Sequence, residues 1–312
     1  MKKNNSRPRQ FKSLSEALHT LGLPGPKHPL ITLINGIDNS IEVKTPTQNH
    51  ILNFYKISFR PRMGGTIRYG QTHFDFNEGG MLFAAPNQII GHLKEQNSTN
   101  ENQDNNLQIT LLIDPDFLLN YPLSKKIKQY NYFSYAVNEA LHLSDKEKEI
   151  ILSVFRIIED ELDSRIDEFS QDVVVSQIDL LLNYANRFYK RQFLTRKEVN
   201  ITMLQNVDEI LEAYFNEQKP LEIGLPSVNY LANCLHITPG YLSDMLRSFT
   251  GLNAQQHIHN KLIEKAKLRL SNTELSVGEI AFQLGFEYPQ SFSKLFKSKT
   301  NFSPKEFRQS FN

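Results

Sequence analysis

Apolar residues change their spacing part-way along the chain. Between about residues 30 and 113, short apolar stretches alternate with polar residues and are interrupted by glycine, proline and asparagine. A period of two is typical of half-buried strands, and several short strands in succession favour a small β-barrel or sandwich. The segment "HFDFNEGGMLFAA" (73–85) also predicts a hairpin that turns at "NEGG".

Beyond residue 141 the apolar period becomes helical. Ser144 and Glu147 have the spacing of a capping box, which marks the start of a helix. Apolar residues then recur every three or four positions in two segments: Ile150, Val154, Ile157, Ile158 and Leu162, followed by Val174, Ile178, Leu181, Ala185 and Phe188. The pattern predicts two amphipathic helices that either pack against the β domain or form a dimer seam. The sequence after about residue 203 is typical of helices joined by short turns.

The last third of the chain contains one unit twice. "SVNYLANCLHITPGYLSDMLRSFTGLN" (227–253) matches "SVGEIAFQLGFEYPQSFSKLFKSKTNFS" (276–303), at an offset of 49 residues in the first half and 50 in the second. The shared positions are mostly apolar or helix-capping, as a shared core requires. Each copy predicts a helix, a tight turn and a second helix, at about 227–250 and 276–300, and "NAQQHIHNKLIEKAKLRL" (253–270) predicts a long joining helix.

The second copy carries a signal for each of its boundaries. Ser276 with Glu279 predicts a capped helix start, and Gly285 suits the left-handed residue that ends that helix. Pro289 suits the first position of the next helix, and Asn301 is expected to end it in the left-handed conformation. A helix, a short turn and a helix form the geometry that places the second helix in a DNA major groove.

The exposed stripe of the second helix has the chemistry of a DNA-reading surface. In the major groove glutamine pairs with adenine, lysine or arginine with guanine, and serine with several base edges, whereas other cations contact phosphates. The contacts expected from the second copy are Gln290, Ser291, Ser293 and Lys294 for bases and Lys297 and Lys299 for phosphates. Those expected from the first copy are Gly240, Tyr241, Ser243, Asp244 and Arg247. Asp244 accepts a hydrogen bond from cytosine but repels phosphate, so the first copy is the weaker candidate.

A helical bundle with a solvated polar face is the alternative to DNA binding. One copy of the pattern alone would favour that alternative, because polar helix faces are usually only solvated. Two tandem copies favour DNA instead. The long joining helix would hold two reading helices so that they enter successive turns of the major groove, about 34 Å apart.

The second copy resembles the C-terminal signature of AraC-type (AraC/XylS) bacterial transcription regulators. That signature is I-A-x-x-x-G-F, then F-S-x-x-F-K, then T-P-x-x-F/Y-R, and the matching stretch is "SVGEIAFQLGFEYPQSFSKLFKSKTNFSPKEFR" (276–308). The resemblance covers about residues 203–312 and implies a tandem helix-turn-helix DNA-binding domain. The N-terminal part resembles the cupin-like sensor domains of this family only in outline.

The resemblance implies a sequence-specific DNA-binding transcription regulator that is not an enzyme. Its partner would be double-stranded DNA. The family pattern further implies control by a small-molecule effector or by homodimerisation through the N-terminal domain, and contact with RNA polymerase if the protein activates transcription. The implied fold class is α+β: a cupin-like β-barrel followed by amphipathic helices, and an all-α C-terminal domain with two helix-turn-helix units joined by a long helix.

The expected domain organisation has five parts. They are a flexible tail (1–20), a cupin-like effector-binding β domain (21–140), a helical dimerisation or packing region (141–190), a linker (191–202) and the DNA-binding domain (203–312).

Composition and charge change this picture little. The 312 residues include 35 Lys and Arg and 34 Asp and Glu, a net charge of +1, so the chain is not a polybasic nucleic-acid binder. Residues 221–312 hold 10 basic and 7 acidic residues, a modest positive excess at one end. No apolar run approaches the roughly 20 residues of a membrane span and no signal peptide is evident, so a cytoplasmic location without membrane contact is expected. The single cysteine, Cys234, fits that compartment and is expected to be buried.

Ligand chemistry in the β domain is limited. Arg60, Arg62 and Arg68, with His73, could clamp an acidic effector, although surface salt links are the commoner role of such arginines. No metal or cofactor is expected, because no cluster of histidines and a carboxylate has cupin-metal spacing. Nucleotide-binding, hydrolase and metalloprotease motifs are absent from the sequence. Two other functions stay open: a metal-dependent cupin enzyme with an accessory DNA module, and a helical protein-interaction adaptor.

Overall fold

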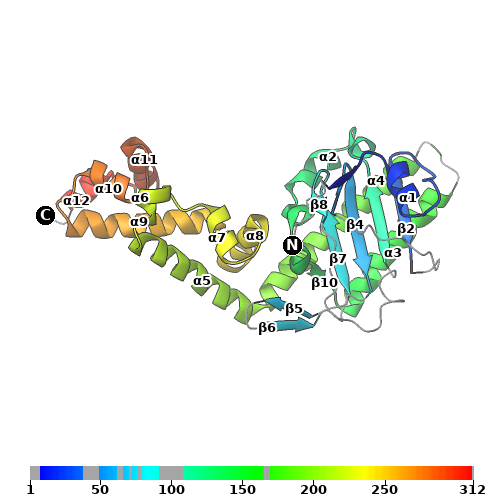
Figure 1. Ribbon diagram of the computed structural model, residues 1–312, viewed down its shortest axis with the longest axis horizontal. Helices are drawn as coiled ribbons and strands as arrows, with labels where there is room; N and C mark the ends of the chain where they lie inside the picture. The colour runs from blue at the N-terminus through cyan, green and yellow to red at the C-terminus, as the bar shows by residue number, and fades with distance from the viewer. Residues whose placement is uncertain are drawn as a thin grey trace, which may run out of the picture. The chain divides into compact units, whose positions relative to one another are not determined.

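The computed structural model describes residues 8–37, 49–61, 66–69, 72–75, 79–90, 108–164, 167 and 169–310. The chain divides into two compact units, residues 1–192 and residues 193–312. All the described strands belong to the first unit, and the described part of the second unit is helical (Figure 1). The expected mixed α+β class, with strands before helices, is confirmed. None of the described helices has both the length and the apolar content needed to cross a bilayer.

The largest sheet of the first unit has five antiparallel strands in the order β10-β7-β4-β9-β2. These strands are β2 (Ile31–Asn35), β4 (Tyr55–Arg60), β7 (Gly80–Ala84), β9 (Ile109–Ile113) and β10 (Leu141–His142). A second sheet joins β1 (Arg9–Phe11), β3 (His50–Leu52) and β8 (Ile89–Ile90), and a third pairs β5 (Thr66–Tyr69) with β6 (Thr72–Asp75). Every residue of β9 is buried, because both faces of the large sheet are covered.

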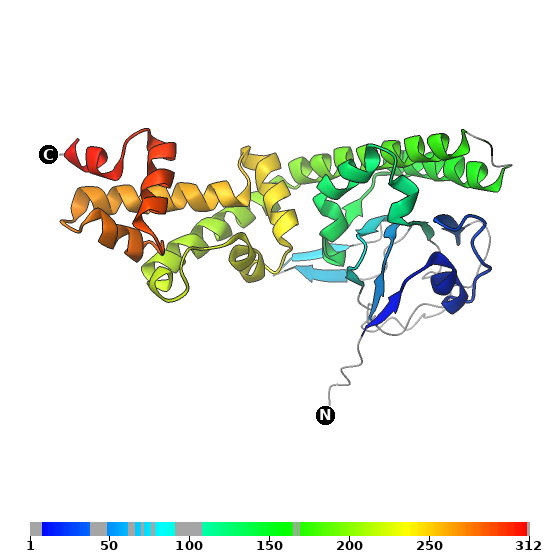
Figure 2. The ribbon, with the colours of Figure 1, turned by 90° about the horizontal axis from the view of Figure 1, so that it is seen from above.

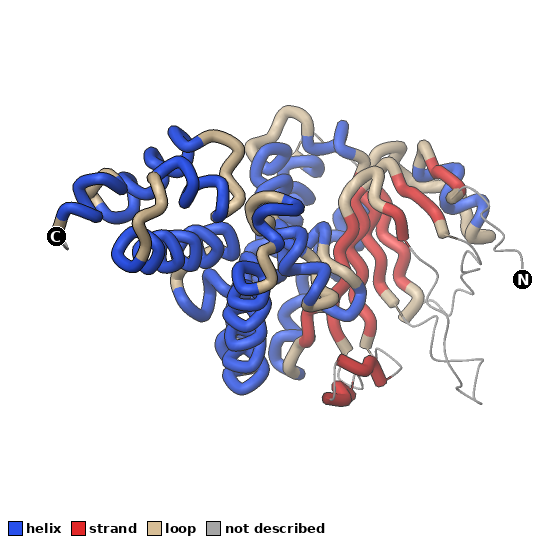
Figure 3. Tube along the Cα trace, turned by 60° about the vertical axis from the view of Figure 1, so that its left-hand side comes forward, coloured by secondary structure: helices blue, strands red, loops and turns tan. Residues whose placement is uncertain are grey.

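One face of the large sheet packs against two long helices, α3 (Asp145–Asp163) and α4 (Ser170–Thr195), which run beside each other in Figures 2 and 3. The ring of Phe83 lies 6.3 Å from that of Tyr189 on α4. The Asn35 amide donates to Glu159 of α3 at 2.8 Å. The structure thus shows the packing alternative for these helices, and the dimer seam stays a prediction.

A chain of short turns, called here the turn segment (115–139), connects β9 to β10 along α4. It comprises η1 (Pro115–Leu118), α2 (Leu123–Lys126), η2 (Ile127–Gln129), η3 (Asn131–Ser134) and η4 (Val137–Glu139). The Lys126 ammonium donates to Asp179 of α4 at 2.6 Å, and the Tyr132 hydroxyl donates to the Leu182 carbonyl at 3.1 Å. These bonds hold the turn segment on the helix.

Residues 9–20 do not form the flexible tail expected from the sequence. They build β1 and α1 (Leu14–Thr20), and Phe11 and Leu14 are 2% and 1% exposed. Ser13 caps α1 by accepting a hydrogen bond from the Glu16 amide at 3.2 Å. The expectation was wrong because a few apolar residues lie within a basic, polar stretch, and they pack into the core on the second face of the large sheet.

The hairpin expected at "NEGG" is also wrong. The strand before it, β6, pairs with β5, while the strand after it, β7, pairs with β4 and β10. Alternation correctly marks both segments as strands. It says which residues are buried, but it does not say which strand is the partner.

The second unit contains eight helices within its described residues. They are α5 (Lys197–Asn216), α6 (Lys219–Ile223), α7 (Val228–Cys234), α8 (Pro239–Thr250), α9 (Ala254–Asn272), α10 (Val277–Gln283), α11 (Pro289–Thr300) and α12 (Pro304–Gln309). Figure 1 shows α9 with α7 and α8 at one end and α10 and α12 at the other. Residues 191–202, expected to be a linker, instead lie almost wholly in the end of α4 and the start of α5. There the buried Asn200 amide donates to the Phe193 carbonyl.

Two contacts hold the second unit together away from its apolar core. Gly285 has a φ of 91°, and a Cβ built on it would lie 2.6 Å from the carbonyl carbon of Gly224, which follows α6. Glu212 of α5 accepts hydrogen bonds from Lys261 and Lys265 of α9. The first contact fixes the turn after α10, and the second joins the two longest helices of the unit.

We expect Gly285→Ala to destabilise the second unit by about 2–4 kcal/mol, because the methyl group combines a left-handed backbone with a backbone clash. His236 occupies the same turn position in the first copy, with a φ of 56°. His236→Gly is the matched control and should stabilise the protein by about 0.5–1 kcal/mol. Thermal unfolding followed by circular dichroism measures both changes. An unchanged melting temperature for G285A would contradict the steric argument.

Hydrogen bonds from Lys265 and Lys261 lower the pKa of Glu212 to about 2. A depressed carboxyl pKa stabilises the fold above the ordinary pKa of 4.5, and this stabilisation is lost as the pH falls towards 2. We expect Glu212→Gln to lower the melting temperature by about 1–3 °C at pH 7, and by less below pH 4.5. The effect stays small because the side chain is 41% exposed to water.

Glu209→Gln, an exposed change on the same helix, is the control for Glu212→Gln and should leave the melting temperature unchanged at every pH. Equal shifts for the two variants would show that the ion pairs of Glu212 do not contribute.

Candidate nucleic-acid interface

The helix pairs α7–α8 and α10–α11 share one backbone turn. The first helix of each pair ends at a leucine with nearly identical dihedral angles, φ −90° and ψ −3° at Leu235 and φ −89° and ψ −2° at Leu284. A left-handed residue follows in both copies. The amide after it donates at 3.0 Å to an alanine carbonyl, from Ile237 to Ala232 and from Phe286 to Ala281. The duplication found in the sequence therefore extends to the hydrogen bonds.

The ends of α8 and α11 are also alike. Gly251 and Asn301 are left-handed, with φ of 79° and 62°, and the sequence predicts this conformation for Asn301. The threonine before each of them donates at 2.8 Å to a carbonyl four residues earlier, from Thr250 to Leu246 and from Thr300 to Phe296. The predicted capping box of Ser276 with Glu279 is confirmed, and Ser303 with Glu306 forms another at the start of α12. The second helix of each copy, α8 or α11, is thus fixed by local hydrogen bonds at both of its ends.

One face of α11 is exposed and carries three of the predicted contacts. Gln290, Lys294 and Lys297 are spaced at i, i+4 and i+7, which places them on one side of the helix. All three are exposed, and no hydrogen bond or ion pair engages them within the described residues. Phe292 and Phe296 on the opposite side are 1% and 0% exposed. The buried side fixes the helix, and the free polar side is available to a ligand.

The other predicted residues of α11 do not all share that face. Ser291 is exposed, whereas Ser293 is half-buried and its hydroxyl donates to the Pro289 carbonyl at 3.0 Å. Lys299 lies nine residues beyond Gln290, about half a turn around the helix. Burial and then the positive charge of Lys299 lower the pKa of His259 on α9. Lys299 therefore lies away from the face that holds Gln290.

In α8, Gly240, Asp244 and Arg247 occupy the positions of Gln290, Lys294 and Lys297. Arg247 forms an ion pair with Asp244 at 3.6 Å, so the charges of this face cancel. Three of the five residues predicted here, Gly240, Ser243 and Asp244, are half-buried.

Tyr241 was expected to lie outside, and this expectation is wrong. The side chain is 8% exposed, and its ring makes an edge-on contact with Phe193 at 5.2 Å. Burial of this large aromatic ring stabilises the fold more than its exposure to water would.

The structure adds Tyr288 to the candidate interface. This residue is 58% exposed and directly precedes α11, where its side chain forms no capping hydrogen bond. The N-terminal residues of a reading helix are those that reach base edges. The sequence signal was available, because Tyr288 stands directly before the helix-starting Pro289.

The predicted effector residues lie in separate sheets. Arg60 is on β4, and its Nε donates to Gln108 at 3.2 Å. Arg68 and His73 face each other in the register of the β5–β6 pair, which is not hydrogen-bonded to the large sheet and of which only the backbone is described. Arg62 lies outside the described residues.

Lys56, which is not among the residues expected from the sequence, shares a face of β4 with Arg60. Burial and then the neighbouring charge of Arg60 lower the pKa of Lys56 to about 8. Within the described residues its ammonium has no hydrogen bond or ion pair. A half-buried cation beside a second cation favours an anion, and its signal in the sequence is a lysine inside the apolar strand "YKISFR" (55–60).

Other groups with metal or redox chemistry are sparse. The described ranges contain no group of three His, Cys, Asp or Glu side chains that could hold a metal ion. Cys234 is exposed, so the expectation that it is buried is wrong. The inner side of α7 is filled by Leu231 and Ala232, whereas Cys234 is the last residue of the helix and is exposed.

Comparison with known proteins finds a family profile and several relatives that match part of the chain. The sequence profile of a family described as "Helix-turn-helix domain" matches residues 231–310. The Msm operon regulatory protein of Streptococcus mutans is 28% identical over 148 residues, which cover 46% of this chain and 52% of that protein. The uncharacterized HTH-type transcriptional regulator YijO of Escherichia coli is 28% identical over 108 residues, covering 35% of this chain and 37% of that protein.

Among solved structures, the C-terminal domain of the two-component response regulator yesN from Fusobacterium nucleatum is 34% identical. The match covers 33% of this chain and 98% of that domain, with a TM-score of 0.29. The matches to the two curated relatives, by contrast, span only about half or less of the length of those proteins. The matched C-terminal region, residues 231–310, therefore carries the helix-turn-helix domain of transcriptional regulators of the AraC type.

Proposed function

We propose that this protein is a sequence-specific transcription regulator that binds double-stranded DNA and reads it mainly through α11. The observation that carries the proposal is the free polar face of Gln290, Lys294 and Lys297 on the second helix of a helix-turn-helix unit. Gln290 and Lys294 lie nearer the N-terminal end of the helix, where side chains reach adenine and guanine. Lys297 is placed one turn further along, where a cation contacts phosphate.

The first copy contributes less to affinity in this proposal. Asp244 neutralises Arg247, and Gly240 offers no side chain where the second copy has Gln290. DNA affinity depends strongly on the number of phosphates that cations neutralise. The α8 face, with no net charge, therefore positions the protein on DNA more weakly than the α11 face does.

The first unit has a sensing role in this proposal. It would form a cupin-like domain that binds an acidic small-molecule effector or mediates homodimerisation, with contact to RNA polymerase if the protein activates transcription. Lys56 and Arg60, two cations on one face of β4, support an anionic effector. A cytoplasmic location follows from the proposed action on DNA.

The base-reading assignment predicts a contrast between neighbouring side chains. Gln290→Ala and Lys294→Ala should each reduce the preference for the target over a scrambled duplex by about 5- to 150-fold, since each base contact discriminates by about 1–3 kcal/mol. Lys297→Ala should weaken both duplexes equally and reduce the slope of log affinity against log salt by about one unit. The target is first selected from randomised duplexes, and fluorescence anisotropy then measures affinity at several salt concentrations.

Lys146→Ala, an exposed change on α3, controls for net charge and should leave both quantities unchanged. Failure of the wild-type protein to prefer any selected duplex at low salt would overturn the proposed function. Retained preference in both Q290A and K294A would place the reading surface elsewhere.

The ion pair on α8 predicts a gain of affinity. Asp244→Asn should release Arg247 to a phosphate, tighten binding to all duplexes by about three- to tenfold at low salt, and steepen the salt slope by about one unit. The double variant with Arg247→Ala should lose this gain. An equal gain in the double variant would show that Asp244 acts through its own repulsion of phosphate and not through Arg247.

A further inference from the structure

Tyr288 occupies a position that capping residues fill in the neighbouring helices. The helices α7, α8, α9, α10 and α12 each follow a Ser, Thr or Asn whose side chain accepts a hydrogen bond from a backbone amide three residues on. In the register of the duplication Tyr288 corresponds to Thr238, which accepts from the Tyr241 amide at 3.3 Å. Tyr288 forms no such bond. The second helix of the second copy therefore begins without a stabilising contact that its counterpart has.

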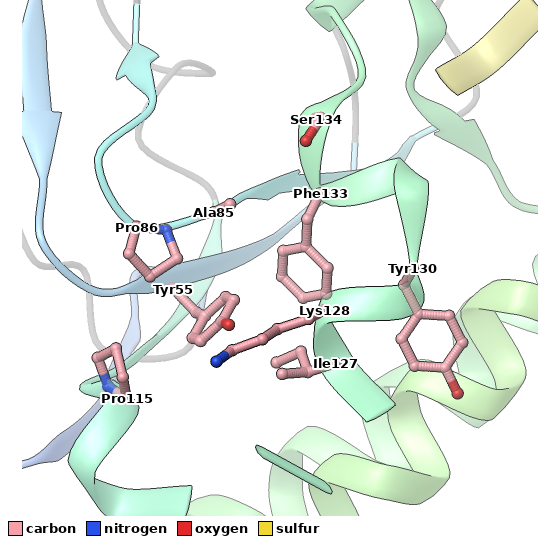
Figure 4. Close-up of a pocket in the computed structure, with 9 residues that line it drawn as sticks. All are labelled: Tyr55, Ala85, Pro86, Pro115, Ile127, Lys128, Tyr130, Phe133 and Ser134. Atoms are coloured by element: carbon pink, nitrogen blue, oxygen red, sulfur yellow. The ribbon is translucent and has the colours of Figure 1, made fainter. Parts of the chain in front are cut away.

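The ring of Tyr288 does not make up for the missing cap by packing. Other aromatic rings of this protein contact one another, even where those of Tyr55 and Phe133 line a hollow of about 390 Å³ between β4 and the turn segment and meet edge-on at 5.3 Å (Figure 4). Tyr288, by contrast, is 58% exposed, and its side chain has no ring contact or hydrogen bond within the part of the chain that the structure describes. The fold gains little from this side chain, which leaves a partner of the helix to explain it.

The surroundings of Tyr288 favour a base edge over a phosphate as that partner. Glu287, directly before it, is exposed and negative, so it repels a phosphate at this position. A serine or threonine hydroxyl could contact phosphate and still cap the helix, so that contact does not require a tyrosine. The apolar group that a base presents in the major groove is the 5-methyl group of thymine.

We propose that Tyr288 is a specificity-determining residue that packs its ring against the 5-methyl group of one thymine in the target. This inference rests on the proposed function, in which the N-terminal residues of α11 lie in the major groove. Gln290 and Lys294 then read hydrogen-bonding edges, whereas Tyr288 reads an apolar group. The target therefore contains a thymine beside the bases that α11 reads.

Deoxyuridine tests the proposal, because it differs from thymidine only in lacking the 5-methyl group. In the duplex selected for the full-length protein each thymine is replaced in turn, and fluorescence anisotropy measures the affinity. We expect the wild-type protein to bind about two- to fourfold more weakly when one particular thymine is replaced, which is the loss for one buried methyl group. Tyr288→Thr should remove this discrimination, and Tyr288→Phe, which keeps the ring, should retain it.

Tyr288→Thr also restores the cap that Thr238 provides in the first copy, so we expect its melting temperature to rise by about 2–5 °C. A residue with only a structural role would lower stability when replaced, whereas here stability rises and thymine preference falls in one variant. Phe302→Thr is the matched control, because Phe302 is 53% exposed and follows the opposite end of α11. This control should discriminate thymine from uracil as the wild type does.

Three results would overturn the inference alone, with the selected duplex still preferred. They are an unchanged wild-type affinity for every uracil-substituted duplex, wild-type discrimination in Y288T, and loss of discrimination in Y288F, which would assign the contact to the hydroxyl. A lower melting temperature for Y288T would show that the ring packs in the fold and would also overturn it. Failure of the wild-type protein to prefer any duplex would instead overturn the proposed function, and this inference with it.

Discussion

Each helix-turn-helix unit depends on one left-handed residue placed directly after its first helix. This residue reverses the chain within a single turn, so the following amide can return to an alanine carbonyl of the helix just ended. In the second copy the residue is Gly285, and the backbone of Gly224 packs against it where a side chain would stand. The direction of α11, and hence the direction of its exposed side chains, follows from this close approach.

The two copies keep this framework and differ on the surface. Leu235 and Leu284 have nearly the same dihedral angles, and the capping contacts repeat in kind. By contrast, Lys294 in one copy stands where Asp244 does in the other. A core position is constrained by neighbours on all sides, whereas an exposed helix position is constrained mainly by what the helix binds. The two copies share their backbone geometry but differ in their exposed side chains, which indicates that the two units have different functions.

Sequence reasoning succeeded where the signal is local. Capping boxes, the left-handed Asn301 and the second-unit helices all depend on residues within a few positions of one another. Predictions from the sequence failed where contacts between segments far apart in the chain determine the structure. Strand pairing after "NEGG" is set by β4, the burial of Tyr241 by Phe193, and the hollow of Tyr55 by residues far along the chain. An alternating or helical pattern shows which residues of a segment are buried, but it does not show which other segments pack against them.

The one-residue difference between the offsets of the repeat has an evolutionary consequence. The extra residue falls in the turn, so both copies preserve the geometry of their second helices despite unequal length. Most positions that distinguish the copies lie on exposed helix faces, and Tyr241, which packs on Phe193 where the second copy has the exposed Ser291, is an exception. A lineage of such proteins could therefore drift from one DNA target to another by exchanging a few surface residues of α11, while Phe292 and Phe296 keep the fold intact.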